Sequence, residues 1–244
     1  MQFQILFYFN SLKSYKQKKV TRYCFKMASH HHDHHHHHHE TFDIERLYKL
    51  FSNCIKDDDT IEMDEYVNAY DELSKLFGIL GSVFSFVTSD VVEKIGILRD
   101  YRKSPEAADY ETFEKMIQYE VEHNITNNKK KASGSRTLLR LHRALEFTSR
   151  LMHDLKTADE HDKMSHITKV AYDETLAKHH PWLIRKGVHV AVYTLPTRKH
   201  FLEKIKHNDP AHAVEFLSKT AEIQERIFNV TEAIYTRENL HGLP

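Results

Sequence analysis

Apolar residues recur every three or four positions along most of the chain, which is the periodicity of amphipathic helices. The pattern starts at about residue 41 in FDIERLYKLFSNCI, where the apolar positions are Phe42, Leu47, Leu50, Phe51 and Ile55. It continues in IEMDEYVNAYDELSKLFGIL, SVFSFVTSDVVEKIGILRDYRK, YETFEKMIQYEVEHNI, a segment from Ser135 to about Lys156, HDKMSHITKVAYDETLAK, HPWLIRKGVHVAVYTLP, TRKHFLEKI and PAHAVEFLSKTAEIQERIFNVTEAIY. These stretches predict about eight or nine helices.

Prolines and one β-rich stretch bear on where these helices begin and end. Pro181 and Pro210 each open a helical pattern, where the first turn tolerates proline, and Pro196 ends one. The segment VHVAVYTL is the best strand candidate, but no second strand is available to pair with it. Neither a repeat nor an internal linker is visible. The sequence therefore predicts a single all-α domain over residues 41–244.

Composition limits the classes of function. The 244 residues contain 35 Lys+Arg and 35 Asp+Glu, so the formal net charge is zero, which argues against a general nucleic-acid binder. The two cysteines, Cys24 and Cys54, cannot build a disulfide framework or a CxxC metal site, which indicates a reducing compartment. No apolar run approaches the roughly 18 residues needed to cross a bilayer. We therefore expect a soluble, cytosolic protein.

Residues 1–40 differ from the rest of the chain. Residues 1–26 join an apolar run to a basic one, an order that is wrong for a secretory signal but leaves a mitochondrial presequence open, while Met27 offers an alternative translation start. Nine of the 21 histidines lie in MASHHHDHHHHHHE, residues 27–40. Such a tract can bind Zn, Ni or Cu but has no fixed geometry, and a tag or a natural repeat would explain it. We expect a disordered extension here, and neither a metal site nor a cofactor in the domain.

The segment SGSRTLLRLHRAL, residues 133–145, places three arginines on one face of a helix. Arg136, Arg140 and Arg143 are spaced by four and three residues, so they form a single stripe, and the leucines lie on roughly the opposite side. A solvated face is the ordinary interpretation of such a stripe. Because the chain has no basic excess, any anion that it binds must be met by a local cluster, and this stripe is the candidate.

Two other places carry chemically distinctive residues. Asp90 and Lys94 are four residues apart and share a helix face, which by itself indicates only a surface ion pair. His180 precedes Pro181 and the one tryptophan, Trp182, which by itself indicates a histidine at the start of a helix and a core tryptophan. The chain has no phosphate-binding glycine loop, HExxH or GxSxG motif, and no nucleophile stands out beside Asp90 and His180. We therefore do not expect an enzyme.

Together these pieces resemble the glycolipid transfer protein family, and within it the subgroup that carries ceramide-1-phosphate. The resemblance covers nearly all of residues 45–244 and is strongest in GSVFSFVTSDVVEKI, SGSRTLLRLHRAL and LAKHHPWLIRKGVHVAVYTLP. It implies a two-layer all-α sandwich of about eight helices that encloses lipid chains, and carriage of a sphingolipid between membranes rather than catalysis. Phe84, Phe86, Val87 and Leu145 are among the apolar residues that would either line the chain pocket or belong to ordinary core.

The resemblance also implies how an amide and a phosphate would be bound. Asp90 matches the family aspartate that accepts the sphingoid amide N–H, and His180 matches the histidine that donates to the acyl amide oxygen. Lys94 stands where the glycolipid carriers have asparagine, and Arg140 where they have a tryptophan that stacks on the sugar. Arg136 matches a second phosphate-binding arginine of the phosphate-selective subgroup. A phosphomonoester prefers such charge-assisted donors to a flat aromatic face.

The remaining expectations concern partners. Trp182 resembles a family tryptophan that dips into the membrane interface, and with Arg185 and Lys186 it implies shallow, transient docking on cytosolic membrane surfaces. Arg143 has no clear headgroup role, and we expect it to be structural. The implied partners are ceramide-1-phosphate or a related sphingolipid and a membrane surface, without nucleic acid, and the chain is expected to be a monomer. A neutral glycosphingolipid carrier, a sphingolipid sensor and a sphingolipid-acting enzyme remain alternatives.

Overall fold

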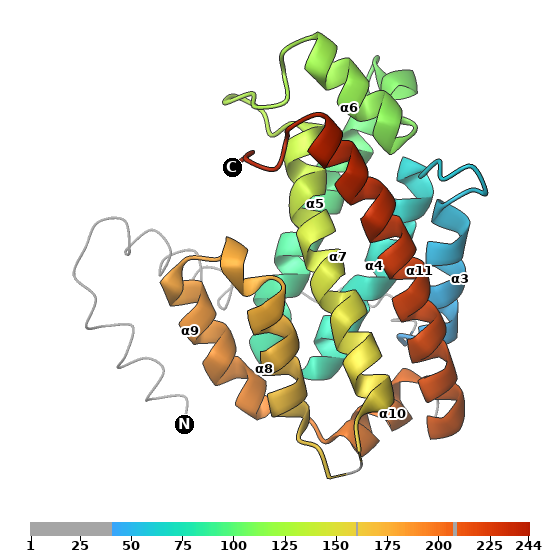
Figure 1. Cartoon of the computed structure of the whole chain (residues 1–244), viewed down its shortest axis with the longest axis vertical. Coiled ribbons are helices and arrows are strands. Elements are labelled where there is room, and N and C mark those ends of the chain that lie inside the picture. The colour runs from blue at the N-terminus through green and yellow to red at the C-terminus, as the bar shows by residue number, and fades with distance from the viewer. Residues whose placement is uncertain (1–40, 160, 207–208) are drawn as a thin grey trace, which may run out of the picture. The chain divides into compact units, whose positions relative to one another are not determined.

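The computed structural model describes residues 41–159, 161–206 and 209–244 (Figure 1). This part of the chain contains nine α-helices, four short 3-10 turns and two isolated β-bridges, but no strand. The helices are α3 (Ile44–Cys54), α4 (Met63–Leu80), α5 (Ser85–Arg102), α6 (Phe113–Glu122), α7 (Gly134–Thr157), α8 (Met164–Glu174), α9 (Trp182–Ala191), α10 (Arg198–Ile205) and α11 (Pro210–Arg237). The predicted all-α class is confirmed. The predictions for residues 1–40, including the histidine tract, lie outside the described residues.

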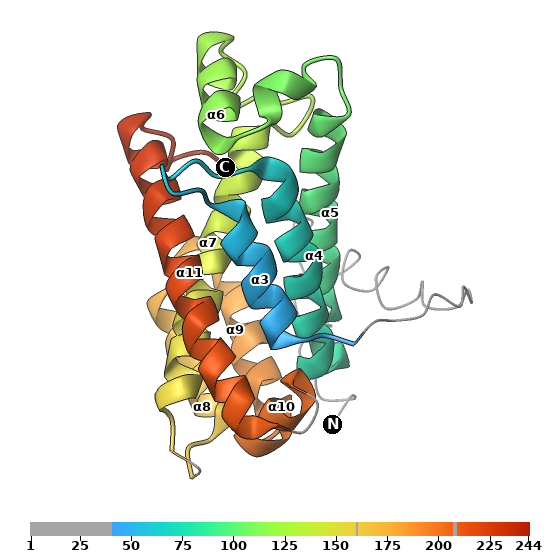
Figure 2. The same ribbon diagram turned by 90° about the vertical axis from the view of Figure 1, so that its right-hand side faces the viewer.

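The described helices are arranged in two layers. Helices α7, α8 and α11 form one layer and α3, α4 and α5 form the other, as the turned view in Figure 2 shows. Contacts of α5 with α7 and of α3 with α11 join the layers along two edges. Helices α6 and α10 lie at opposite ends of the bundle (Figure 1). Residues 41–244 form one compact unit, and the predicted two-layer sandwich is confirmed.

The apolar stripes seen in the sequence meet between the layers. The buried residues of the two facing helices include Val91, Ile95 and Leu98 from α5 and Leu138, Leu141 and Leu145 from α7. Burying one such side chain contributes about 1.5–3 kcal/mol, so the leucines determine which face of α7 is turned inward. The arginine stripe is consequently left on the outer side of this helix.

Local sequence signals explain where several helices begin and end. Gly81 follows α4 at φ 119°, a conformation that side chains other than glycine rarely adopt. Pro210 occupies the first turn of α11, with Asp209 as its N-cap. The strand candidate VHVAVYTL is helical, since α9 runs to Ala191 and a 3-10 turn covers Val192–Thr194. Among the described residues, no helix combines the length and apolar character that spanning a membrane requires.

Candidate functional site

A buried carboxylate fixes the first turn of α7. Glu120 of α6 is 0% exposed and accepts hydrogen bonds from the backbone N–H groups of Gly134 (2.7 Å) and Ser135 (2.8 Å) and from the Tyr110 hydroxyl (3.0 Å). A carboxylate there satisfies free helix N–H groups and complements the helix dipole. A Cβ at position 134 would lie 2.4 Å from Sδ of Met116, so a larger residue there would displace that side chain. These contacts set the position of the arginine-bearing helix.

The three arginines of α7 have different environments. Arg140 is exposed and makes no hydrogen bond or ion pair with the described part of the chain. Nε of Arg136 donates to the carbonyl oxygen of Pro244 at 3.0 Å. The guanidinium of Arg143 donates to the carbonyl oxygen of His241 at 2.8 Å, and burial, followed by the charge of Arg140, lowers its pKa. Arg143 thus holds the C-terminal segment, whereas Arg140 presents an unoccupied guanidinium at the surface.

Lys94 and Asp90 form an ion pair on α5. Lys94 is only 8% exposed, and its Nζ donates to Oδ1 of Asp90, whose own side chain is largely in solvent. The lysine side chain is therefore buried, and its ammonium pairs with a carboxylate that remains largely exposed. Oδ2 of Asp90 has no hydrogen bond with any described residue, so it remains open as an acceptor.

Helices α5 and α7 lie side by side and run antiparallel (Figure 2). The Tyr101 hydroxyl donates to the carbonyl oxygen of Ala132 at 2.9 Å, so the end of α5 lies beside the start of α7. Lys94 lies about two helical turns before Tyr101, and Arg140 lies about two turns after Ala132. Each residue is therefore roughly 10–12 Å along the helix axis from this hydrogen bond. The two cations are therefore level with each other on neighbouring helices.

His180 is held by the turn between α8 and α9. It follows the 3-10 turn Ala177–His179, and Pro181 restricts its backbone to the extended conformation observed (φ −106°, ψ 141°). Its Nδ1 lies 2.7 Å from the Tyr172 hydroxyl. Burial lowers the pKa of His180, and the negative charge of Asp90 opposes this shift. The imidazole is therefore neutral at pH 7, and the Asp90 carboxylate of α5 lies close enough to act on it.

Cations from two elements share this end of the bundle. Burial, followed by the charges of Arg143 and Lys178, lowers the pKa of His179 to about 4, and Glu232 is the opposing charge. The charge of Arg140 in turn helps to lower the pKa of Arg143. The arginine stripe and the turn before α9 therefore act electrostatically on each other, and Lys178 in that turn is paired with Glu146 at 3.9 Å.

Trp182 opens α9 at the surface. Its side chain is 51% exposed, so the alternative of a core tryptophan is excluded. Nζ of Lys186 lies 5.9 Å from the indole centroid. The residues that line a surface hollow of about 470 Å³ here are Asp173, Ala177, Lys178, Trp182, Arg185, Lys186 and His189. An exposed indole among cationic side chains suits the headgroup level of a membrane.

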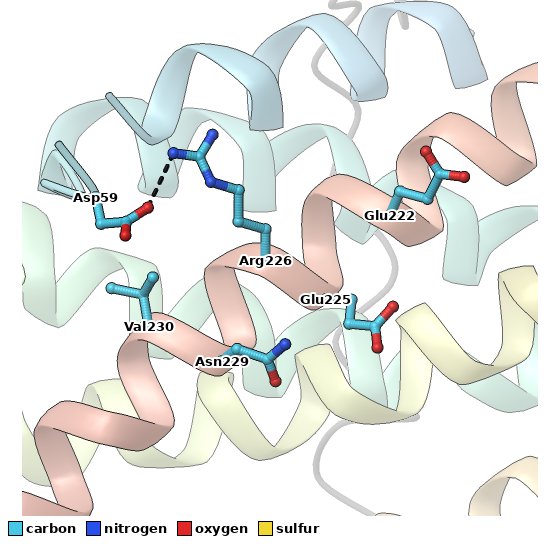
Figure 3. A pocket seen from close by; sticks show the side chains of 6 residues that line it. All are labelled: Asp59, Glu222, Glu225, Arg226, Asn229 and Val230. Atoms are coloured by element: carbon cyan, nitrogen blue, oxygen red, sulfur yellow. Dashed lines mark hydrogen bonds and ion pairs between the residues drawn. The ribbon is translucent and has the colours of Figure 1, made fainter. Parts of the chain in front are cut away.

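A second hollow of about 460 Å³ lies on α11 and the loop after α3, and its lining is acidic. Figure 3 shows the lining side chains, which are Asp59, Glu222, Glu225, Arg226, Asn229 and Val230. The one guanidinium among them, that of Arg226, is already paired with Asp59 at 2.9 Å. Three carboxylates give this hollow the wrong charge for an anionic headgroup, and it contains none of the predicted site residues.

The structure therefore pairs Lys94 with Asp90, whose charge acts on His180, and it directs Arg136 toward the C-terminal segment. By helical rise, Arg140 on α7 is about level with Lys94 on α5. Sequence reasoning missed Tyr172, the hydrogen-bond partner of His180. Tyr172 and His180 are separated by a turn, so helical periodicity does not connect them. No group of three or more metal-ligating side chains occurs among the described residues.

Comparisons with known proteins decide the family. The family model for glycolipid transfer protein matches residues 61–207. The chain belongs to the glycolipid transfer protein family. The ceramide-1-phosphate transfer protein of Danio rerio is 35% identical over 209 residues, which cover 84% of this chain and 99% of that protein. The predicted family resemblance is confirmed, and the family is one of lipid carriers rather than enzymes, as the sequence indicated.

Solved structures of two relatives share the fold over most of this chain. The apo form of the mouse ceramide-1-phosphate transfer protein superposes with a TM-score of 0.80 at 33% identity, covering 83% of this chain and 100% of that structure. The human ceramide-1-phosphate transfer protein in complex with 12:0 ceramide-1-phosphate gives a TM-score of 0.78 at 31% identity. This match covers 83% of this chain and 100% of that structure. The match thus spans the whole of each solved structure and 83% of this chain.

Proposed function

We propose that this chain carries ceramide-1-phosphate, or a closely related phosphorylated sphingolipid, between membranes. The observation that carries the proposal is the Lys94–Asp90 pair, which offers a cation for a phosphate and an open carboxylate oxygen for an amide N–H in one place. The relatives support the same cargo, because they are ceramide-1-phosphate transfer proteins and the human one binds that lipid in its crystal.

The phosphate is bound by Lys94, Arg140 and Arg136. A phosphomonoester carries about −1.5 to −2 charges at neutral pH, and planar guanidinium groups match its oxygens with paired N–H donors. Among the described residues, none binds the guanidinium of Arg140, and Arg136 uses only Nε on Pro244, which leaves its two terminal nitrogens. Arg140 is exposed and Arg136 is partly exposed, so a phosphate bound there avoids the large desolvation penalty of a buried dianion.

The amide is bound between Asp90 and His180. A trans amide points its N–H and its C=O in opposite directions, so it needs an acceptor on one side and a donor on the other. Oδ2 of Asp90 accepts the sphingoid N–H, and Nε2 of His180 donates to the acyl oxygen. A glycerolipid ester has no N–H, which makes this pair of residues selective for sphingolipids.

The lipid chains occupy the apolar interior between the layers. About thirty methylenes exposed to water would cost on the order of 24 kcal/mol at about 0.8 kcal/mol each, and enclosing them removes most of that barrier. Val87 is partly buried on the same helix as Asp90, and Phe84 and Leu145 are buried in the core beyond it. Phe86 is exposed and takes no part in the core.

Loading and release take place at a membrane surface. Trp182, with Arg185 and Lys186 beside it, docks transiently on cytosolic membrane faces by inserting the indole to headgroup depth. The chain acts there as a monomer, because the proposed phosphate and amide groups all come from one copy.

A vesicle-to-vesicle transfer assay tests the proposal. The full chain is given donor vesicles with fluorescent ceramide-1-phosphate, a fluorescent glycosylceramide or fluorescent phosphatidic acid, and transfer to acceptor vesicles is followed by loss of energy transfer. We expect ceramide-1-phosphate to be transferred far faster than the other two lipids. Transfer of the glycosylceramide at a similar rate would show that the arginine stripe does not select phosphate, and transfer of phosphatidic acid at a similar rate would show that the amide is not recognised.

The same assay separates the alternatives. A sphingolipid sensor would bind ceramide-1-phosphate without moving it between vesicles, and an enzyme would convert it to a product visible by mass spectrometry. Either result would contradict carriage.

A further inference from the structure

The Tyr172 hydroxyl is the only partner of Nδ1 of His180 among the described residues. Tyr172 lies on α8 and is 2% exposed, and its oxygen is 2.7 Å from Nδ1. The two rings are 5.7 Å apart between centroids and are tilted by 40°. One hydrogen bond therefore joins the imidazole of the proposed amide site to the neighbouring helix.

The direction of this hydrogen bond follows from the burial of both groups. Burial raises the pKa of Tyr172 to about 12, so the phenol keeps its proton at neutral pH. Burial also lowers the pKa of His180, so its ring is neutral and carries one N–H. If that N–H were at Nδ1, it would donate to the Tyr172 oxygen, and the phenol proton would have no acceptor among the described residues. A buried donor without an acceptor costs about 1–3 kcal/mol.

The opposite arrangement satisfies both groups. When the Tyr172 hydroxyl donates to Nδ1, the ring proton resides on Nε2, and no buried proton is left without a partner. Nε2 of His180 has no hydrogen bond within the described part of the chain, so its N–H is free for a ligand.

The tautomer decides what His180 can bind. An amide oxygen accepts a hydrogen bond from Nε2–H, but it would meet a lone pair on the other tautomer and be repelled. The Asp90 carboxylate already supplies the acceptor for the amide N–H, so the second group must be a donor. A site with two acceptors would not hold an amide.

We propose that Tyr172 is a positioning residue for the amide site: its hydroxyl donates to Nδ1 of His180 and holds the imidazole as the Nε2–H tautomer that an acyl amide oxygen requires. This inference rests on the proposed function for its ligand, but the tautomer itself is a property of the unliganded protein. The two statements can therefore fail separately.

The first test uses the unliganded full chain labelled with ¹⁵N-histidine. Two-bond ¹H–¹⁵N correlation spectra distinguish the two neutral tautomers by the shifts and couplings of the ring nitrogens. The signals of His180 are those that disappear in His180→Gln. We expect the Nε2–H pattern at pH 7.5, and a predominant Nδ1–H pattern would overturn the proposal. This measurement needs no change at Tyr172, so it remains decisive even if a variant there does not fold.

The second test is Tyr172→Phe, which keeps the ring and removes the hydroxyl. We expect His180 to become a mixture of tautomers and ceramide-1-phosphate transfer to fall about tenfold, the effect of losing roughly one hydrogen bond. The matched control is Tyr101→Phe, which removes a half-buried hydroxyl that donates to the carbonyl oxygen of Ala132 at 2.9 Å, away from His180. The control should keep both the tautomer and the transfer rate of the wild type.

The outcomes separate the two claims. If the wild type transfers ceramide-1-phosphate and Tyr172→Phe changes neither the His180 tautomer nor transfer, the role of Tyr172 is refuted and the proposed function stands. If the wild type transfers no lipid but His180 shows the Nε2–H pattern that Tyr172→Phe disrupts, the proposed function is refuted and the role of Tyr172 in fixing the tautomer is supported.

Discussion

The ammonium of Lys94 donates to Oδ1 of Asp90, one turn earlier on α5, and leaves Oδ2 of the same carboxylate open. The aspartate can therefore accept an amide N–H without releasing the lysine. The lysine can turn its other two N–H groups toward a phosphate. In the proposed site, one helical turn thus links recognition of the headgroup to recognition of the amide.

Replacing Lys94 should weaken binding of the phosphate specifically. We expect Lys94→Met to lower ceramide-1-phosphate transfer by about tenfold or more, because a charge-assisted hydrogen bond is worth roughly 1.5–3 kcal/mol. The matched control is Lys115→Met, which removes the lysine of an i,i+4 pair with Glu111 of the same orientation. Equal transfer by the two variants would show that Lys94 has no role in the site.

Substitutions of Arg140 and Arg143 should have different effects, the first on lipid transfer and the second on stability. Arg140→Leu removes an unpaired guanidinium and relieves its repulsion of Arg143, so we expect transfer to be abolished and Tm to be unchanged or slightly higher. Arg143→Leu removes the hydrogen bond to His241, so we expect a free energy of unfolding lower by about 1–2 kcal/mol. Transfer and thermal unfolding, measured on both variants, check this, and normal transfer by Arg140→Leu would disprove the headgroup assignment.

Asp90 should be required for the transfer of every sphingolipid, whatever its headgroup. We expect Asp90→Val to remove transfer of ceramide-1-phosphate and of any other sphingolipid that the wild type moves, because the amide N–H loses its acceptor. Asp100→Val, an exposed position on the same helix, is the control. An Asp90→Val protein that lost only the phosphate-bearing lipid would show that Asp90 acts through Lys94 rather than on the amide.

Glu120 should be required for stability. We expect Glu120→Gln to lower the free energy of unfolding by about 3 kcal/mol, because a buried carboxylate that satisfies two backbone N–H groups is replaced by an amide that can satisfy only one side. Urea unfolding measures the change. The exposed Glu114→Gln on the same helix should cost less than about 0.5 kcal/mol. Similar changes in the free energy of unfolding for Glu120→Gln and Glu114→Gln would show that the contact of Glu120 with the first turn of α7 does not stabilise the protein.

The buried His142 should make the protein less stable in mild acid. It is 2% exposed, its ring stacks on Phe228, and burial lowers its pKa from the ordinary 6.5 although Glu232 lies against it. The unfolded chain therefore takes up this proton before the folded protein does, and the free energy of unfolding falls as the pH drops below about 6.5.

Urea unfolding at pH 7 and pH 5 measures this dependence, in a window where ordinary carboxylates remain largely ionised. Between pH 7 and pH 5, His142→Phe should lose less stability than the wild type. The control His166→Phe, which changes an exposed histidine, should lose as much stability as the wild type. An unchanged loss in His142→Phe would exclude His142 as a source of the acid sensitivity.

The sequence predicted those contacts of the candidate site that lie within a single helix. The spacing of Arg136, Arg140 and the leucines of α7 determines which face is buried, because burial of the leucines outweighs any preference of the arginines. The Asp90–Lys94 pair likewise follows from the geometry of one turn.

Contacts between elements could not be predicted in this way. The hydrogen bond from Tyr172 to His180 crosses a turn whose path depends on tertiary packing, and the contact of Arg136 with Pro244 joins residues 108 positions apart. The burial of Glu120 could not be predicted either. A glutamate in a helix is usually exposed, and only the tertiary contact with the N-terminus of α7 shows that this one is buried.

The most direct test exchanges the two proposed headgroup residues for those that the family resemblance assigns to glycolipid carriers. Transfer of ceramide-1-phosphate and of a glycosylceramide is measured for the wild type and for the double variant Lys94→Asn with Arg140→Trp. The ratio of the two rates should favour ceramide-1-phosphate in the wild type and fall by about a hundredfold or more in the variant, as expected for the loss of two charge-assisted contacts. An unchanged ratio in a folded double variant would show that Lys94 and Arg140 do not select the phosphate.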